Sequence, residues 1–342
     1  MKSVLVTGGA GFIGSAFVRS LFDDDPDVQI LVLDALRYSG DVGNISATVR
    51  ESERFEFWPG SVNDVDLVGE LVGRSDAVVH FAAETHVARS LFSNREFFET
   101  DVLGTQAVAN AVLRHANTVE RFVHISTSEV YGTALDESMD EEHPLKPCTP
   151  YAAAKAGADR LVYSYVESYD LPAVIIRPFN NYGPGQHLEK VVPRFITSLL
   201  LDEPLTVHGD GSAVRDWIFV EDTVRAVNLA LQAPIDRIRG EVINVATGRG
   251  ASVLEIAHAL TEAHPESSSS IDYMEDRLGQ VAKHLAATEK ARDLLGFEYS
   301  IELEEGLERT IKWYADNRSW WERRLDLRKV PVKLRDGKVV WY

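Results

Sequence analysis

Residues Thr7-Gly8-Gly9-Ala10-Gly11-Phe12-Ile13-Gly14 lie between an expected first strand, Ser3–Thr7, and an expected first helix, 15–22. Glycines at these spacings allow a tight turn, the close approach of a pyrophosphate to the main chain, and close packing of the helix on the strand. The helix then directs its N-terminal N–H groups at the phosphates. The stretch therefore predicts a dinucleotide site, with contacts from Gly8, Gly11, Phe12, Ile13 and Gly14.

A carboxylate at the end of the second expected strand, 30–34, extends this pattern. Asp34 stands where a carboxylate accepts a hydrogen bond from a ribose 2′-hydroxyl and repels a 2′-phosphate, so NAD is predicted over NADP. Arg37 nearby keeps NADP open as an alternative. Residues at further strand ends are expected to line the adenosine and pyrophosphate groove: Ser61, Val62, Phe81, Ala82 and Ala83.

The order of apolar and helical patterns indicates the fold class. Short aliphatic runs at 3–7, 30–34, 55–58, 77–81, 121–126 and 173–177 alternate with helical spacing at 15–22, 64–72, 97–115 and 150–168. This alternation predicts an α/β fold, a Rossmann-like doubly wound parallel sheet. After Pro178 the elements shorten, and we expect a smaller C-terminal α/β substrate lobe. We place the NAD-binding part at 1–178 and the substrate part mainly at 179–342, with the chain free to cross between them.

Composition narrows the classes of partner and location. The 342 residues carry 35 basic and 53 acidic side chains, a net charge of −18, which argues against nucleic acid and against an anionic membrane surface. Cys148 is the single cysteine, so neither an intramolecular disulfide nor a thiolate metal cluster is expected, and no metal site is predicted. No apolar run approaches the roughly 20 residues that span a bilayer. A strand begins at once with no signal segment, so the expected location is cytoplasmic.

Two stretches near the middle of the chain carry proton-handling groups. Ser126-Thr127-Ser128-Glu129-Val130-Tyr131-Gly132 is followed by Tyr151-Ala-Ala-Ala-Lys155. Tyr151 and Lys155 are four residues apart on an expected helix and share one face. An ammonium beside a phenol favours the phenolate, so we expect Lys155 to lower the pKa of Tyr151 and make it a base near neutral pH.

Six motifs together resemble the extended short-chain dehydrogenase/reductase family. They are TGGAGFIG at 7–14, HFAAETHVARS at 80–90, STSEVYG at 126–132, YAAAK at 151–155, RPFNNYGP at 177–184 and GDGSAVRDWIFVED at 209–222. Within the family they are most similar to nucleotide-sugar dehydratases, decarboxylases and epimerases, and the resemblance extends to about residue 317. It implies a tightly held NAD, a nucleoside-diphosphate sugar as substrate and a homodimer.

The resemblance also implies roles for the central residues. Tyr151 would remove the proton of the sugar 4-hydroxyl while a hydride passes from C4 to NAD. Lys155 would tune Tyr151 and hold the nicotinamide ribose, and Thr127 would hydrogen-bond the 4-oxygen. The resulting 4-ketone acidifies the C5 proton, or makes a C5 carboxylate ready to leave as carbon dioxide.

The pair Ser128-Glu129 bears on the step that follows. Dehydratases of thymidine-linked glucose typically have Asp-Glu here, where the Glu takes the C5 proton and the Asp protonates the departing 6-hydroxyl. Ser128 lacks that acid, and decarboxylases of UDP-glucuronate resemble this chain in having Thr-Ser-Glu. Some dehydratases acting on GDP-mannose or UDP-N-acetylglucosamine share Thr-Ser-Glu, so the alternatives stay open. The carboxylate of Glu129 argues against a simple 4-epimerase.

The second half of the chain supplies the expected substrate contacts. Amides and cations that could hold a sugar diphosphate are Asn180, Asn181, Lys190, Arg194, Arg215 and Arg277. The planar guanidinium of Arg215, at a matching family position, suits a phosphate. The segment 180–190 looks more like the thymidine-linked glucose dehydratases than the decarboxylases. Ala88 and Asp101 stand where the family usually has Asp and Asn.

The favoured expectation from the sequence is an NAD-dependent lyase that decarboxylates UDP-glucuronate to a UDP-4-keto-pentose or UDP-xylose. The alternative is an NDP-glucose 4,6-dehydratase acting on a dTDP- or UDP-sugar, and a 4-epimerase comes third. A non-catalytic NAD-binding protein would fit the fold but gives no reason for Thr127, Glu129, Tyr151 and Lys155 to occur together.

Overall fold

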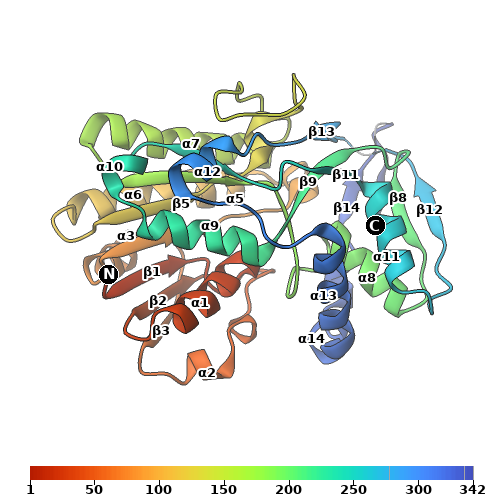
Figure 1. Ribbon diagram of the computed structural model, residues 1–342, viewed down its shortest axis with the longest axis horizontal. Coiled ribbons are helices and arrows are strands. Elements are labelled where there is room, and N and C mark those ends of the chain that lie inside the picture. The colour runs from red at the N-terminus through yellow and green to blue at the C-terminus, as the bar shows by residue number, and fades with distance from the viewer. Residues whose placement is uncertain (277, 335, 342) are drawn as a thin grey trace.

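A seven-stranded parallel sheet forms the core of the larger part of the molecule, seen on the left of Figure 1. The computed structural model describes residues 1–276, 278–334 and 336–341. The strands of the sheet are β1 (Ser3–Thr7), β2 (Gln29–Asp34), β3 (Phe55–Pro59), β4 (Ala77–His80), β5 (Arg121–Ile125), β6 (Ala173–Pro178) and β10 (Val242–Val245). Their order is β10-β6-β5-β4-β1-β2-β3, so the direction of strand addition reverses between β1 and β4. The predicted doubly wound Rossmann-like sheet is confirmed.

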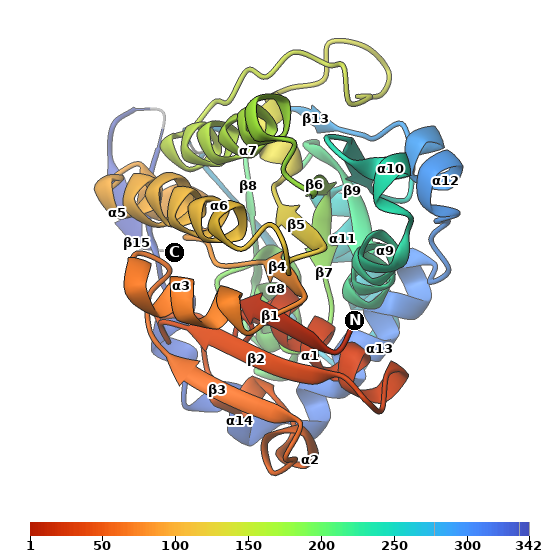
Figure 2. The same ribbon diagram turned by 90° about the vertical axis from the view of Figure 1, so that its left-hand side faces the viewer.

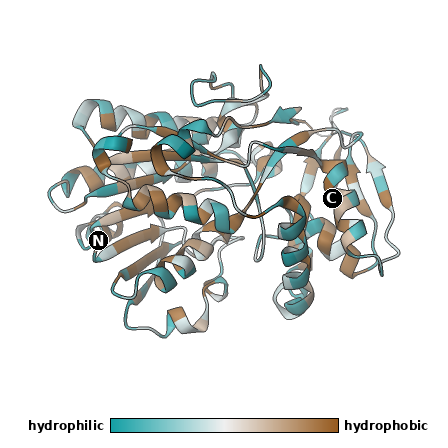
Figure 3. Ribbon diagram, viewed as in Figure 1, coloured by the Kyte–Doolittle hydropathy of each residue, from teal (hydrophilic) through white to brown (hydrophobic). Residues whose placement is uncertain are grey.

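The strands are apolar on both faces because helices cover both. On β1, Val4 and Val6 enter one core cluster while Leu5 enters the other. The helices on the Val4 side are α1 (Phe12–Asp24), α2 (Ala47–Arg50), α9 (Val220–Gln232), α10 (Ile235–Ile238) and α12 (Glu289–Leu295). Those on the Leu5 side are α3 (Val65–Gly73), α6 (Thr105–Arg114) and α7 (Pro150–Tyr169). Figure 2 shows the two helical layers on either side of the sheet, and Figure 3 shows hydrophobic residues along the strands between them.

The chain returns to this sheet after it has left it. Residues beyond Pro178 form α9, which packs beside α1, and β10, which pairs in parallel with β6. In the register of this pair, Val242 lies opposite Ile175 and Val245 opposite Pro178. The second half of the chain therefore contributes to both parts of the molecule.

A smaller lobe lies beside the carboxyl ends of the strands, on the right of Figure 1. Its short strands are β7 (Asn180–Tyr182), β8 (Leu205–His208), β9 (Val214–Phe219), β11 (Gly250–Ser252), β12 (Ile271–Met274) and β13 (Lys283–His284). Its helices are α8 (Val191–Leu200), α11 (Val253–Ala263), α13 (Leu303–Asp316) and α14 (Arg318–Glu322). The lobe has its own apolar core, in which Tyr314 and Trp321 are fully buried.

The last described residues fold back on the cavity side of the molecule. A turn η4 (Leu325–Arg328) precedes a hairpin of β14 (Pro331–Lys333) and β15 (Val339–Trp341). Val330, Val332 and Leu334 pack against Ala88, in the short helix α4 (Val87–Ser90). The family position usually occupied by Asp is thus an apolar contact for the tail. Tyr342 lies outside the described residues.

The helix expected over 97–115 is interrupted. A short helix α5 (Arg95–Phe97) passes into a wider π-helical segment, η2 (Phe98–Gly104), before α6 begins. The wide turn leaves Asp101 fully buried, and its main-chain oxygen accepts a hydrogen bond from Thr105 Oγ1 at 2.6 Å. The apolar spacing of a π segment resembles that of an α-helix too closely for the sequence to separate the two. Among the described residues, no helix combines the length and apolarity needed to cross a bilayer.

Candidate active site

A cavity of about 600 Å³ lies between the carboxyl ends of the central strands and the smaller lobe. Ligands of doubly wound folds bind in this place, at the point where strand order reverses. Residues predicted as site residues that line it are Gly8, Gly11, Phe12, Ile13, Gly14, Asp34, Ser61, Val62, Phe81, Ala82, Ala83, Thr127, Ser128, Glu129, Tyr151, Lys155, Asn180, Asn181, Lys190 and Arg215. The structure therefore brings segments from both halves of the chain around one cavity.

The glycine-rich turn fits a dinucleotide phosphate. Gly8 has φ +70°, and a Cβ placed on it would lie 2.6 Å from the main-chain nitrogen of Ala82. A Cβ on Gly14 would lie 2.2 Å from the carbonyl oxygen of Gly8. Helix α1 starts after Gly11 with no side chain capping it. Its first N–H groups, next to the cavity, thus suit an anion.

Asp34 is held in place for a ribose. Its carboxylate accepts hydrogen bonds from the main-chain nitrogens of Ala10, at 2.9 Å, and Leu36, at 2.8 Å. Burial raises the pKa of Asp34, against these two hydrogen bonds. The Arg37 guanidinium lies 3.4 Å from a carboxylate oxygen of Glu84 and forms an ion pair with it. The arrangement suits a 2′-hydroxyl better than a 2′-phosphate.

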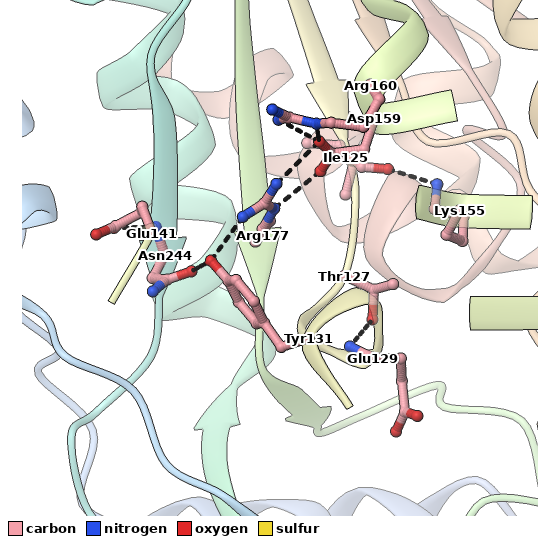
Figure 4. Close-up of polar contacts among 10 residues, drawn as sticks. All are labelled: Ile125, Thr127, Glu129, Tyr131, Glu141, Lys155, Asp159, Arg160, Arg177 and Asn244. Atoms are coloured by element: carbon pink, nitrogen blue, oxygen red, sulfur yellow. Dashed lines mark hydrogen bonds and ion pairs between the residues drawn. The ribbon is translucent and has the colours of Figure 1, made fainter. Parts of the chain in front are cut away.

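Tyr151 and Lys155 lie in the first turns of α7. The Thr149 hydroxyl caps this helix by accepting from the main-chain nitrogen of Ala152 at 3.2 Å, and Pro150 occupies its first turn. Both functional side chains are almost fully buried. Lys155 donates from Nζ to the carbonyl oxygen of Ile125 at 2.7 Å, and Figure 4 shows this bond joining the helix to strand β5.

The electrostatics of Tyr151 differ from the expectation. Burial raises the pKa of Tyr151, the carboxylates of Asp101 and Glu129 raise it further, and a side-chain hydrogen bond with Thr127 lowers it. Burial also lowers the pKa of Lys155, while Asp101 and Asp159 oppose that effect. The pKa of Tyr151 is thus raised in this structure, whereas the sequence predicted that Lys155 would lower it.

Asp101 adds a carboxylate that the sequence did not interpret. Its Oδ1 accepts from the main-chain nitrogen of Glu84 at 2.8 Å. Among the described residues, its Oδ2 has no hydrogen-bond donor. Burial raises the pKa of Asp101, and the charge of Lys155 opposes this. The Asp101 carboxylate and the Lys155 ammonium therefore interact in one buried region close to Tyr151.

A short turn, η3 (Ser128–Tyr131), presents the next two groups to the cavity. Thr127 caps it, with its hydroxyl accepting from the main-chain nitrogen of Glu129 at 3.2 Å. His284 lies directly behind: its Nδ1 is 3.5 Å from Ser128 Oγ and 3.9 Å from a carboxylate oxygen of Glu129. Sequence reasoning missed His284, because a lone histidine so far along the chain carries no signal of this contact.

A buried hydrogen-bond network joins β6, α7 and η3, as Figure 4 shows. Arg177 donates to both carboxylate oxygens of Asp159, at 2.8 and 2.9 Å. It also donates to the Tyr131 hydroxyl, which in turn donates to Asn244, each at 2.8 Å. Burial alone would raise the pKa of Asp159, but Arg177 outweighs it and holds the pKa below its usual value. The network fixes β6, α7 and η3 relative to one another.

The predicted substrate residues fall into three groups. Asn180, Asn181, Lys190 and Arg215 line the cavity, and Lys190 donates from Nζ to the Thr85 carbonyl oxygen at 2.9 Å. Arg194 is not among the lining residues, and its guanidinium donates to the main-chain oxygen of Arg328 at 2.7 Å. Arg277 lies outside the described residues.

The lining also contains groups that the sequence did not indicate. Glu189 is buried 3.2 Å from His86 Nε2 and 3.5 Å from an Arg89 guanidinium nitrogen. Val330 and Val332 of the tail also reach the cavity. Within the described ranges, no group of His, Cys, Asp and Glu side chains is arranged to hold a metal ion.

Comparison with known proteins identifies the family. Residues 5–310 match the model of the GDP-mannose 4,6 dehydratase family. A dTDP-glucose 4,6-dehydratase from an Actinoplanes strain is 42% identical over 323 residues, which cover 93% of this chain and 99% of that protein.

Solved structures agree. The dTDP-glucose 4,6-dehydratase DesIV of Streptomyces venezuelae, solved with NAD bound, is 39% identical, with a TM-score of 0.88 over 94% of this chain and 99% of that one. A UDP-glucuronic acid 4-epimerase from Bacillus cereus, solved with UDP-glucuronic acid and NAD, is 29% identical, with a TM-score of 0.86 over 92% and 99%. The chain belongs to the extended short-chain dehydrogenase/reductase family, in the nucleotide-sugar group that the GDP-mannose 4,6 dehydratase model describes.

Proposed function

We propose that the protein is an NAD-dependent 4,6-dehydratase that removes water from a nucleoside-diphosphate hexose, with dTDP-glucose as its substrate. The observation that carries this proposal is the convergence of Thr127, Glu129 and Tyr151 on one cavity that the glycine-rich turn also lines. Relatives aligned over nearly their whole length, at about 40% identity, support the same substrate.

This proposal replaces the preference for decarboxylation of UDP-glucuronate. That preference depended on Ser128, which lacks the acid of the thymidine-linked enzymes. The relative solved with UDP-glucuronic acid is an epimerase and is less similar to this chain than the dTDP-glucose dehydratases are. The balance of similarity therefore supports dehydration, which the sequence left as the alternative.

The cofactor proposed is NAD, held by the glycine-rich turn and by Asp34. The missing Cβ atoms of Gly8 and Gly14 leave room for a pyrophosphate, and the carboxylate of Asp34 suits a 2′-hydroxyl. Bound NAD would supply the hydride acceptor for C4 and the hydride donor for C6. Lys155, one helical turn after Tyr151, would hold the nicotinamide ribose.

The chain's own groups handle the protons. Tyr151 takes the proton of the 4-hydroxyl, and the Thr127 hydroxyl, its hydrogen-bond partner, holds the 4-oxygen. The 4-ketone then withdraws electrons from C5, whose proton the Glu129 carboxylate accepts. Elimination of the 6-hydroxyl follows from the electron pair left at C5.

Cations on the lobe side suit the diphosphate. Lys190 and Arg215 line the cavity of a chain that is otherwise strongly acidic, and Asn180 adds an amide. A guanidinium and an ammonium concentrate positive charge where two phosphates would lie. We also propose a homodimer, as the resemblance implies.

Incubation with NAD and either dTDP-glucose or UDP-glucuronate tests the proposal. Mass spectrometry is expected to find loss of one water from dTDP-glucose, and a carbon dioxide assay is expected to stay blank with UDP-glucuronate. Release of carbon dioxide without dehydration of dTDP-glucose would restore the decarboxylase. The Tyr151→Phe variant is the control, since it should be inactive in either reaction.

A further inference from the structure

The serine that lacks the expected acid has a histidine behind it. His284, on β13, is fully buried, and its Nδ1 lies 3.5 Å from the Oγ of Ser128. Ser128 lines the cavity and His284 does not. Any effect of His284 on a ligand therefore passes through Ser128 or through Glu129, 3.9 Å from the same ring nitrogen.

The hydrogen bond of the other ring nitrogen fixes the tautomer of His284. Its Nε2 lies 2.7 Å from the carbonyl oxygen of Gly132, which can only accept, so Nε2 carries a hydrogen. In the neutral ring, Nδ1 is then an acceptor that draws the Ser128 hydroxyl hydrogen away from the cavity. In the protonated ring, Nδ1–H donates to Ser128 Oγ and leaves the serine hydrogen free to point at a ligand.

We propose that His284 is a positioning residue that supplies, through the Ser128 hydroxyl, the proton with which the 6-hydroxyl departs as water. The inference rests on the proposed dehydratase function. Hydroxide is a poor leaving group, so elimination at C6 needs an acid, and Ser128 alone is too weak an acid to be one. The Ser128–His284 pair takes the place of a single carboxylic acid.

The proton and electron balance closes. The C5–H electron pair forms the C5–C6 double bond as the Glu129 carboxylate takes the C5 proton. The C6–O6 bond breaks with its pair on oxygen, O6 takes the Ser128 hydroxyl proton, and Ser128 Oγ takes the Nδ1 proton of His284. The leaving group is water, Glu129 gains one proton, and His284 loses one that solvent later restores.

The charges around His284 link the two proton transfers. The pKa of His284 lies below its usual value, because burial and the charges of Arg215 and His143 outweigh the Glu129 carboxylate and the Gly132 hydrogen bond, which raise it. When Glu129 takes the C5 proton, its negative charge disappears. The support for protonated His284 is lost at that moment, so the ring becomes a stronger acid when the hydroxyl has to leave.

The test is His284→Gln, assayed with dTDP-glucose and with its 6-deoxy-6-fluoro analogue. Glutamine can keep the hydrogen bond to Gly132 but has no proton to give to Ser128. We expect dehydration of dTDP-glucose to fall about 10²-fold or more, the usual range for loss of a general acid. Fluoride leaves without a proton from the protein, so elimination from the analogue should stay near the wild-type rate. C4 oxidation, followed by transient NADH absorbance, should persist.

Further variants separate this role from a structural one. Adding Ser128→Asp to His284→Gln should restore dehydration, since a carboxylic acid then stands beside the substrate. The wild-type dehydration rate should rise as pH falls from 8 toward 6, and this dependence should vanish in His284→Gln. If His284→Gln does not fold, Ser128→Ala with the same two substrates tests the same relay.

Two results would overturn the inference. One is an equal loss of rate on both substrates, which means damage to the site and not to proton supply. The other is unchanged dehydration of dTDP-glucose in His284→Gln. Both differ from failure of the proposed function, in which the wild-type protein itself would dehydrate no nucleoside-diphosphate hexose and the inference would fall with it.

Discussion

The Lys155 ammonium is bonded to the main-chain oxygen of Ile125 at 2.7 Å, which ties helix α7 to the end of strand β5. Thr127 follows that strand and Tyr151 lies in the first turn of that helix, so the bond helps to hold the two groups near each other. Lys155 thus contributes to the geometry of the site, while burial raises the pKa of Tyr151.

Tyr151→Phe should abolish C4 oxidation while leaving the fold intact. The ring would keep its edge contact with Phe97, 6.2 Å between centroids, and lose only the hydroxyl that handles the proton. We expect the rate at which NADH absorbance appears to fall by about 10²–10⁴-fold. Tyr163→Phe, on the exposed face of the same helix, is the matched control and should keep wild-type activity. Oxidation by Tyr151→Phe at the wild-type rate would remove Tyr151 from the mechanism.

Asp101→Asn should shift the pH profile of C4 oxidation toward acid. The Asp101 carboxylate raises the pKa of Tyr151, and asparagine keeps the oxygen that accepts from Glu84 but removes the charge. Tyr151 then loses its proton more easily, so the acid limb of kcat/KM should move down by about one pH unit. An acid limb that stays in place or moves to higher pH would contradict the coupling.

The same substitution should change stability in a pH-dependent way. Burial raises the pKa of Asp101 to about 7 in the folded state, so the wild-type protein loses stability as pH rises from about 4 to about 7. Asparagine does not titrate, so the variant should gain stability relative to the wild type across this window in urea unfolding. A constant difference across that range would contradict this assignment.

Asp159→Ala should destabilise the fold by about 3–5 kcal/mol, because it leaves the buried Arg177 charge without its partner. The pKa of Asp159 lies below its usual value, so its contribution is present above about pH 4 and is lost as pH falls further. Urea unfolding at pH 7 and at pH 3 checks both statements. Asp170→Asn, which removes the charge of an exposed pair with Arg239 and still suits the φ of 57° at that position, should cost no more than about 1 kcal/mol. Equal losses in the two variants would contradict the role of burial.

Gly8→Ala should weaken NAD binding by roughly tenfold or more, since a strained turn and a displaced β4 end both act on the phosphate site. The new Cβ would lie 2.6 Å from the Ala82 nitrogen, at φ +70°. Gly296→Ala has nearly the same φ, +65°, but no atom within 4 Å of its Cβ. It carries the conformational strain alone and should bind NAD normally, as isothermal titration would show. Similar NAD affinities in the two variants would mean that the close approach at Gly8 does not matter.

The sequence predicted what depends on neighbouring residues. The glycine turn, Asp34 at a strand end and the helical spacing of Tyr151 and Lys155 are local patterns with one structural solution, and all line the cavity. The contacts that decide acidity are not local. Ser128 meets His284 across 156 positions, and Arg177 meets Asp159 from a neighbouring strand.

The sequence shows a carboxylate at Asp101, but it does not show what that carboxylate contacts. A sequence does not show that a helix widens into a π segment and buries that carboxylate near Lys155. The short strands of the lobe were missed for a similar reason. β7 and β11 each have three residues and exist because β9 pairs with them, which no periodicity within either segment reveals.

Strand β10 comes long after β6 in the chain, which has a consequence while the protein is synthesised. While a ribosome makes the chain, β6 has an unpaired edge until Val242–Val245 emerges and pairs with it. An open strand edge is a template for joining another chain. A fragment that ends at Pro178 would keep that edge open and is therefore expected to aggregate, although it contains Tyr151, Lys155 and the whole glycine-rich turn.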